Sequence, residues 1–227
     1  MVIGRAGEAY RHAQSPNSKA FHFSARVCEV CNNARTQPAD LAFDKFNAQA
    51  FSLLKRGLDP AEVHNDPRFS SSGGYLYLNV FRYFAKLMCC HLAEMGAPFY
   101  EQIADFAIGI SNTNFVLLRV DVDVTYQRIQ ERLPSASYAA HGGLIITGDE
   151  FSHAPTSFYS TLTIGPVRYC YQIRFNELGQ LLLRIEHPAF YDWCKRKVRD
   201  AIDNPISDVD REILGLAPKT PNKQRGV

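Results

Sequence analysis

The chain has no long apolar run. None of its stretches reaches the roughly 18 apolar residues that a membrane-spanning helix needs, so no such helix is expected. It also lacks a Gly-rich phosphate loop, a nucleotide-binding fingerprint, an internal repeat and, over residues 1–8, the apolar core of a signal peptide. Hydrophobic residues make up 46% of the 227 and charged residues 21%, which excludes a disordered chain, a coiled coil and a collagen-like repeat.

A strong charge of one sign is missing as well, because the net charge is only +2. The charge is unevenly placed, however. Residues 1–37 hold five basic and two acidic side chains, and residues 195–227 hold eight and five, so each end carries +3 and the middle carries −4. Basic ends on a mildly acidic body are compatible with contact to nucleic acid, and equally with charge that is simply solvated.

A second Cys-x-x-Cys pair is also missing. The six cysteines are Cys28, Cys31, Cys89, Cys90, Cys170 and Cys194. With no secretion signal and a chain this long, reduced thiols in a cytoplasmic protein are expected rather than a disulfide framework. The last four lie in apolar segments, where cysteine acts as a small hydrophobe. The run Cys89-Cys90-His91 does not suit one ion, because consecutive helical residues point about 100° apart.

The hydrophobic pattern changes period along the chain, which predicts an α+β fold. Helical spacing predicts helices over 39–56, 75–95 and 98–108, with a loop over 58–74. Alternation then predicts strands over 118–124 and 143–147 and a hairpin of 157–164 with 167–175, followed by a turn at 176–179, a segment over 180–186 and a closing helix over 188–202. Helices before strands favour an antiparallel meander over a parallel sheet.

This pattern predicts three parts. They are an N-terminal unit over 1–57, a helical and antiparallel-sheet domain over 75–202, and a loose tail over 203–227.

The stretch from Cys28 to Asp40 carries the most chemistry. Two cysteines separated by two residues can hold one soft ion from a tight turn, with each sulfur about 2.3 Å from zinc. A structural zinc site needs four ligands, so this single pair supplies half of one. A redox dithiol, or a pair with no such role, is the alternative.

The order Cys-x-x-Cys-Asn-Asn-x-Arg-Thr-Gln-Pro-x-Asp, followed by an acidic and aromatic helix, resembles the second zinc knuckle of HNH-type endonucleases over residues 22–46. The resemblance implies that Cys28 and Cys31 are structural zinc ligands. It implies that Asn32 or Asn33 fills the last HNH position, near a catalytic magnesium or manganese ion. It also implies that Arg35 faces a DNA phosphate.

The chain departs from that family before Cys28. The family's first half holds another Cys-x-x-Cys pair and a histidine that acts as general base, whereas residues 1–27 contain no cysteine and only two histidines, His12 and His22. The expectation is a truncated relative, or one that has lost its nuclease half. His12 is then the candidate base. His22 could join the cysteines as a ligand, or two chains could share a zinc site of four cysteines in a homodimer.

Three functions follow from these residues. An active protein would hydrolyse DNA phosphodiesters with a divalent metal ion. The alternative is a non-catalytic module that binds nucleic acid or regulates, and the third is a structural protein. No membrane partner is expected.

Two further groups of charged residues are candidates for a site. Asp121 and Asp123 lie two apart on a predicted strand, so both carboxylates could hold magnesium or simply be solvated. Arg168 and Arg174 share one face of another strand and, with the basic side chains of 195–199, could form a phosphate-binding surface. Charge near the end of a helix also suits the helix dipole without any ligand.

Overall fold

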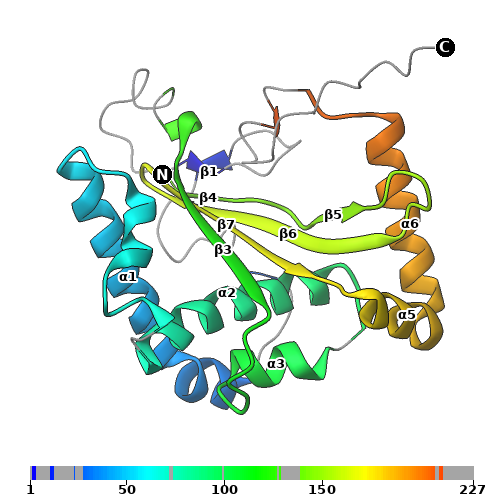
Figure 1. Cartoon of the computed structure of the whole chain (residues 1–227), viewed down its shortest axis with the longest axis horizontal. Helices are drawn as coiled ribbons and strands as arrows, with labels where there is room; N and C mark the ends of the chain where they lie inside the picture. Colours follow the sequence, from blue (N-terminus) through cyan, green and yellow to red (C-terminus); the bar gives the residue numbers. More distant parts are fainter. Residues whose placement is uncertain are drawn as a thin grey trace.

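The fold is an antiparallel sheet with helices packed beneath it (Figure 1). The computed structural model describes residues 2–3, 11–12, 23, 28–71, 74–98, 100–126, 128, 139–207 and 210–211. Within these residues no helix has the length and apolar character to cross a membrane. The α+β class predicted from the sequence is confirmed.

The elements follow one another in a simple order. The helices are η2 (Cys31–Arg35), α1 (Gln37–Lys55), η3 (Pro60–Asn65), α2 (Tyr75–Glu94), α3 (Glu101–Ala107), α5 (Glu177–Glu186) and α6 (Pro188–Asp203). The strands are β1 (Val2–Ile3), β2 (Arg11–His12), β3 (Val116–Val122), β4 (Ala139–His141), β5 (Ile145–Gly148), β6 (Pro155–Ile164) and β7 (Val167–Arg174).

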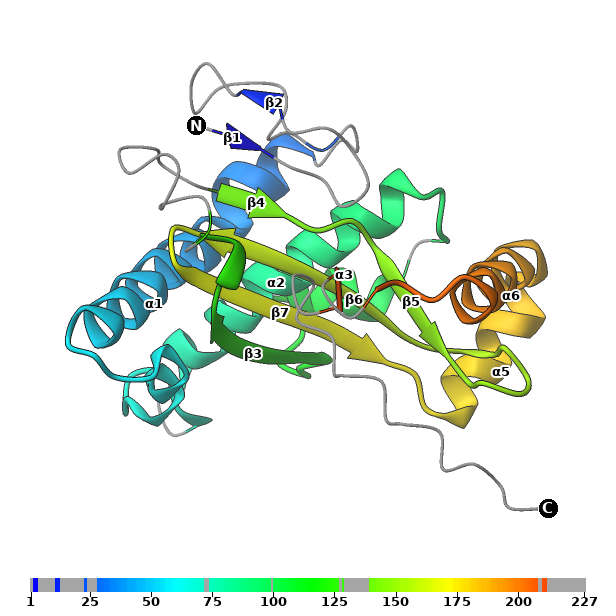
Figure 2. The ribbon, with the colours of Figure 1, turned by 90° about the horizontal axis from the view of Figure 1, so that it is seen from above.

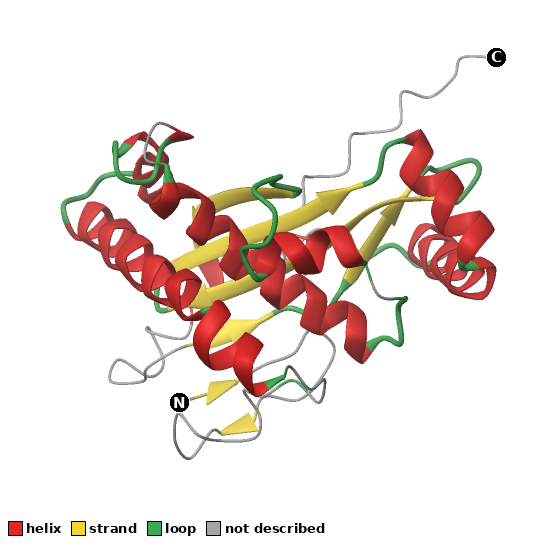
Figure 3. Cartoon of the chain, turned by 90° about the horizontal axis from the view of Figure 1, so that it is seen from below, coloured by secondary structure: helices red, strands yellow, loops and turns green. Residues whose placement is uncertain are grey.

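The main sheet has the order β3-β7-β6-β4, and β5 also pairs with β6. All of its pairings are antiparallel. Helices α1, α2 and α3 cover one face, which Figure 3 shows with the helices in front of the strands. Figure 2 presents the opposite face, with α2 and α3 behind the sheet. The two faces therefore have different environments, and strand alternation decides which side chains meet each one.

A two-residue turn sets the register of the central hairpin. Ile164 pairs with Val167, which leaves Gly165 and Pro166 as the loop. Gly165 has φ +55°, and a β-carbon there would lie 2.6 Å from the Phe51 ring of α1. Glycine suits this place for both reasons, since it takes positive φ without strain and lets the turn approach the helix closely.

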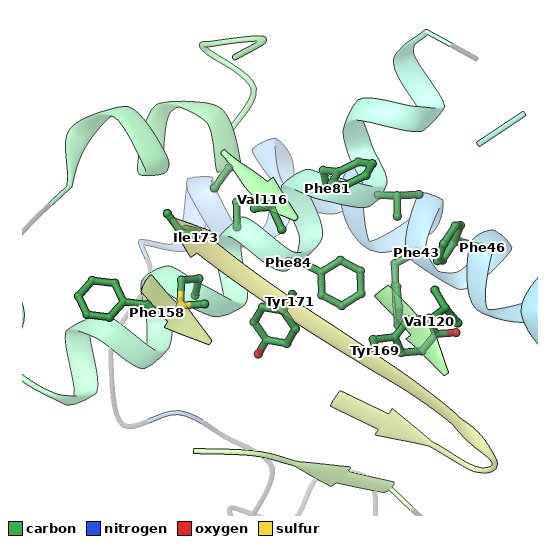
Figure 4. Close-up of a cluster of buried hydrophobic side chains, with 14 of the residues drawn as sticks. Phe43, Phe46, Phe81, Phe84, Val116, Val120, Phe158, Tyr169, Tyr171 and Ile173 are labelled. Atoms are coloured by element: carbon green, nitrogen blue, oxygen red, sulfur yellow. The ribbon is translucent and has the colours of Figure 1, made fainter. Parts of the chain in front are cut away.

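Aromatic side chains form the core between the helices and the sheet (Figure 4). Phe84 of α2 is fully buried at its centre. Its ring centroid lies 5.4 Å from that of Phe43, 5.7 Å from that of Tyr169 and 5.1 Å from that of Tyr171. Edge-to-face and tilted rings at these distances pack well and exclude water. Because Phe43 belongs to α1, this helix shares one core with α2 and the sheet.

A buried polar cluster lies inside this otherwise apolar layer. His91 of α2 places its Nε2 atom 3.0 Å from the Tyr171 hydroxyl and 3.0 Å from Ser160 Oγ, and all three residues are almost fully buried. Ser160 also donates to the carbonyl of Gly142 at 3.2 Å. Buried polar groups need such partners, so the cluster fixes α2 against β6 and β7.

Most expected elements occur where the sequence places them, and three expectations need correction. The expected loop over 58–74 contains the short helix η3, because Asp59 caps it by accepting a hydrogen bond from the Ala61 amide at 2.8 Å. Residues 139–141, where the pattern predicts no strand, form β4. The turn at 176–179 begins a helix, since the Asn176 side chain accepts from the Gly179 amide at 2.8 Å.

Replacing Phe84 by alanine tests this core. We expect Phe84→Ala to lower the free energy of unfolding by about 3–5 kcal/mol, because the cavity removes contacts with three aromatic rings. Phe151→Ala is the control, since that ring is 82% exposed and its loss should change stability by less than about 0.5 kcal/mol. Urea unfolding of both variants measures the difference, and equal losses would contradict the packing.

Candidate functional site

The cysteine pair forms the first turn of the helical segment that leads into α1. Cys28 precedes the helix, and its backbone carbonyl accepts from the Asn32 amide at 2.9 Å. Its sulfur accepts from the Cys31 amide at 3.1 Å, the interaction that a capping side chain makes with the third helical residue. The sequence spacing thus gives a turn in which the Cys31 amide contacts the Cys28 sulfur.

Contacts with α2 hold this turn in place. Thr36 is buried where η2 meets α1, and its hydroxyl donates to the Asn32 carbonyl at 2.9 Å. Lys86 of α2 donates to the same hydroxyl at 3.4 Å and forms an ion pair with Asp40. The cysteine turn is therefore fixed to the core by its C-terminal side, while its tip faces solvent.

The two thiols have unequal environments. Cys28 is exposed, and hydrogen bonds from the side chain and then the backbone of Cys31 hold its pKa below the ordinary value, with a smaller effect of the nearby Arg35 charge. Cys31 is half-buried, and its hydrogen bond to Cys28, together with burial, raises its pKa. Cys28 is therefore the more accessible thiol and the one that loses its proton more readily, whereas Cys31 is shielded and stays protonated to higher pH.

The other predicted site residues are only partly placed. Asn32 and Arg35 are exposed on the same turn as the cysteines. The backbone of Asn33 lies in η2 between them, but its side chain is outside the described part, as is all of His22. Arg35 therefore stays a predicted phosphate contact, and His22 and Asn33 stay predictions.

His12 lies at the end of strand β2, away from the cysteine turn. Strand β2 pairs with β1, and β1 lies beside β4. In Figure 1, β1 is at the top of the view, whereas the blue start of the first helix is at the bottom. The structure does not bring the strand of the candidate base to Asn32, although the side chain of His12 itself is outside the described part.

A tetrahedral zinc site is only half formed by the residues that can be described. No group of three or more histidine, cysteine, aspartate or glutamate side chains is placed to hold a metal ion in this part of the chain. Cys28 and Cys31 offer two sulfur ligands, and a structural zinc ion takes four. Two further ligands, from His22 or from a second chain, remain predictions.

A second group of candidate site residues lies on the sheet face opposite α1–α3. We call Arg119 and Asp121 of β3 with Arg168, Gln172 and Arg174 of β7 the β3–β7 strip. Cross-strand register places Arg119 opposite Cys170 and Asp121 opposite Arg168. Tyr169, Tyr171 and Ile173 of the same strand point into the core instead, as the two-residue period requires.

Ion pairs organise the strip around Asp121. Its carboxylate lies 2.8 Å from Arg119 Nε and 3.9 Å from a terminal nitrogen of Arg168. The Arg119 side chain is 55% exposed and that of Arg168 only 7%, while Arg174 is exposed at the end of β7. Three arginines against one carboxylate leave the strip positive, with Arg119 and Arg174 as the groups that solvent can reach.

The paired-carboxylate hypothesis is not supported by the geometry of Asp123. This side chain is buried and accepts a hydrogen bond from Thr163 at 2.6 Å and from the Tyr126 amide at 2.9 Å. Asp121 is engaged by arginines instead. Each carboxylate has its own partners, so the two do not converge on one ion.

Thiol labelling tests the geometry of the cysteine turn. We expect Cys28 to react first with iodoacetamide, with a pH midpoint below that of an ordinary cysteine, because its pKa is lowered. Cys194 should react only after unfolding, since burial raises its pKa to about 12. Peptide mass spectrometry follows each site, with Cys28→Ser expected to remove the fast phase and Cys89→Ser to leave it. A faster reaction at any other cysteine would contradict the geometry.

The HNH resemblance thus rests on the motif around Cys28 and Cys31. No protein-family model, no curated protein and no solved structure matches this chain.

Proposed function

We propose that this protein binds nucleic acid without cutting it, and that the β3–β7 strip is its contact surface. The observation that carries the proposal is the pair of solvent-accessible arginines, Arg119 and Arg174, on the sheet face opposite α1–α3. Guanidinium groups bind phosphate through planar, paired hydrogen bonds and stay charged at any physiological pH.

The spacing of the strip suits an extended phosphate backbone. Arg119 lies on β3 opposite Cys170 of β7. Arg174 is four residues further along β7, which corresponds to roughly 13 Å at about 3.3 Å per residue. Arginines in a row contact the phosphates of a nucleic acid, which carry no sequence information, so binding without strong sequence preference is expected.

Preorganisation supports the same function. Asp121 holds the Arg119 side chain, and Arg168 lies behind the same carboxylate. When the side-chain amide of Gln172 is oriented with its oxygen toward Arg174, that oxygen accepts hydrogen bonds from two nitrogens of the Arg174 guanidinium, at 2.9 and 3.1 Å. Arginine side chains that are already positioned lose less conformational freedom when they bind.

The family resemblance is compatible with a nuclease and with a non-catalytic binding protein, and we favour the second. Hydrolysis by an HNH-type site would need a base such as His12 and a divalent ion near Asn32 or Asn33. Strand β2 pairs with β1, and Figure 1 shows β1 at the opposite end of the view from the start of the first helix, which favours the alternative in which the nuclease half is not assembled. The resemblance favours DNA as the ligand.

Arginine substitutions on the strip test the proposal. We expect Arg119→Ala and Arg174→Ala each to weaken binding of a fluorescent DNA oligonucleotide by about tenfold and to reduce the dependence of log K on log salt by about one unit, because each removes one phosphate contact. Arg56→Ala is the matched control, since Arg56 is exposed at the C-terminus of α1, away from the strip. Fluorescence anisotropy over a salt series measures both quantities, with single-stranded and duplex oligonucleotides as separate arms.

Two outcomes would contradict the proposal. An equal loss of DNA affinity in Arg56→Ala would mean that a positive charge anywhere on the surface suffices for binding. Nicking of supercoiled plasmid in magnesium or manganese that disappears in His12→Ala would show that the protein is a nuclease after all.

A further inference from the structure

The cysteine turn has a chemistry that the proposed function does not use. Cys28 and Cys31 lie one helical turn apart, with the Cys31 amide donating to the Cys28 sulfur at 3.1 Å. Two cysteines one helical turn apart can be joined by one disulfide with little movement of the backbone.

Exposure separates the roles of the two sulfurs. Cys28 lies at the tip of the turn and is exposed, while Cys31 is half-buried behind it. The backbone amide of Cys31 donates a hydrogen bond to the Cys28 sulfur at 3.1 Å, and such a donor stabilises negative charge on that sulfur. An accessible thiol that favours its thiolate form attacks a disulfide, and a neighbouring shielded thiol resolves the product.

We propose that Cys28 and Cys31 form a thiol–disulfide exchange site whose substrate is the disulfide of a small thiol. The Cys28 thiolate attacks one sulfur of the substrate, which forms a mixed disulfide and releases one molecule of the small thiol as its thiolate. Cys31 then loses its proton to solvent and attacks the Cys28 sulfur, releasing the second molecule. Two cysteine thiols are oxidised to one intramolecular disulfide, and one substrate disulfide is reduced to two thiols.

The other cysteines of the chain do not offer this chemistry. Cys90, Cys170 and Cys194 are buried in the fold, and burial raises the pKa of each thiol. Cys89 is half-buried, and burial raises its pKa to about 12. The reactive pair is thus confined to the turn that leads from Cys28 into η2, and the exposed Asn32 and Arg35 lie in η2 itself.

Exchange with oxidised glutathione tests the proposal on the full chain. The reduced protein should form a Cys28–Cys31 disulfide, seen by peptide mass spectrometry as loss of two hydrogens from the peptide that holds both residues. Cys31→Ser should trap glutathione on Cys28, because the resolving thiol is gone. Cys28→Ser should react at least about tenfold more slowly than the wild type.

Controls distinguish a folding defect in a variant from a loss of the exchange reaction. Cys89→Ser should exchange like the wild type, and the circular dichroism of every variant should match that of the parent. Metal content is measured on the same samples. Three results would overturn the proposal, namely equal rates in Cys28→Ser, no adduct in Cys31→Ser, or one zinc ion per chain that blocks both thiols until it is chelated. DNA binding by the strip is measured separately, so failure of one proposal leaves the other standing.

Discussion

The alternation of strand β7 is the constraint on which the rest of the molecule depends. Tyr169, Tyr171 and Ile173 point into the core, and the residues between them point to the opposite face. A slip of one residue would bury the arginines of the strip and expose the tyrosines. The turn at Gly165 and Pro166 fixes this register, because its glycine has positive φ and lies against Phe51 of α1. The core and the candidate nucleic-acid surface are therefore set by the same hairpin.

The polar cluster around His91 has a structural role within this arrangement. Its imidazole contacts Ser160 and Tyr171, and the Phe23 ring packs edge-on against it with centroids 4.9 Å apart. A serine beside a histidine is also found in hydrolytic sites, but Ser160 and His91 are buried, so a substrate does not reach them. The cluster instead satisfies polar atoms inside an aromatic core and makes the packing of α2 on the sheet specific.

Sequence patterns predicted the elements that have strong periodicity. Helices α1 and α2 and the hairpin of β6 and β7 follow from apolar spacing and from the Gly165-Pro166 turn. Strand β4 was missed because three residues are too few to establish alternation. The helical start of α5 is not predicted, although Leu178, Leu181 and Ile185 recur at helical spacing, because the residue types of 176–179 are also typical of a turn.

The candidate sites were predicted unevenly for a similar reason. The Cys-x-x-Cys spacing predicts that both cysteines lie in one tight turn, and that turn is present. Which thiol is exposed depends on how Thr36 and Lys86 hold the turn against α2, and this contact joins residues 50 apart in the chain. Likewise, Arg168 and Arg174 share a face by alternation alone, but Arg119 joins them only through the pairing of β3 with β7.

Hydrogen–deuterium exchange in the presence and absence of a DNA oligonucleotide tests whether DNA lies along the β3–β7 strip. We expect the oligonucleotide to slow exchange in residues 116–122 and 167–174 and to leave α1 unchanged. Protection confined to the cysteine turn, over residues 28–36, would contradict it and would return the function to the zinc-knuckle motif.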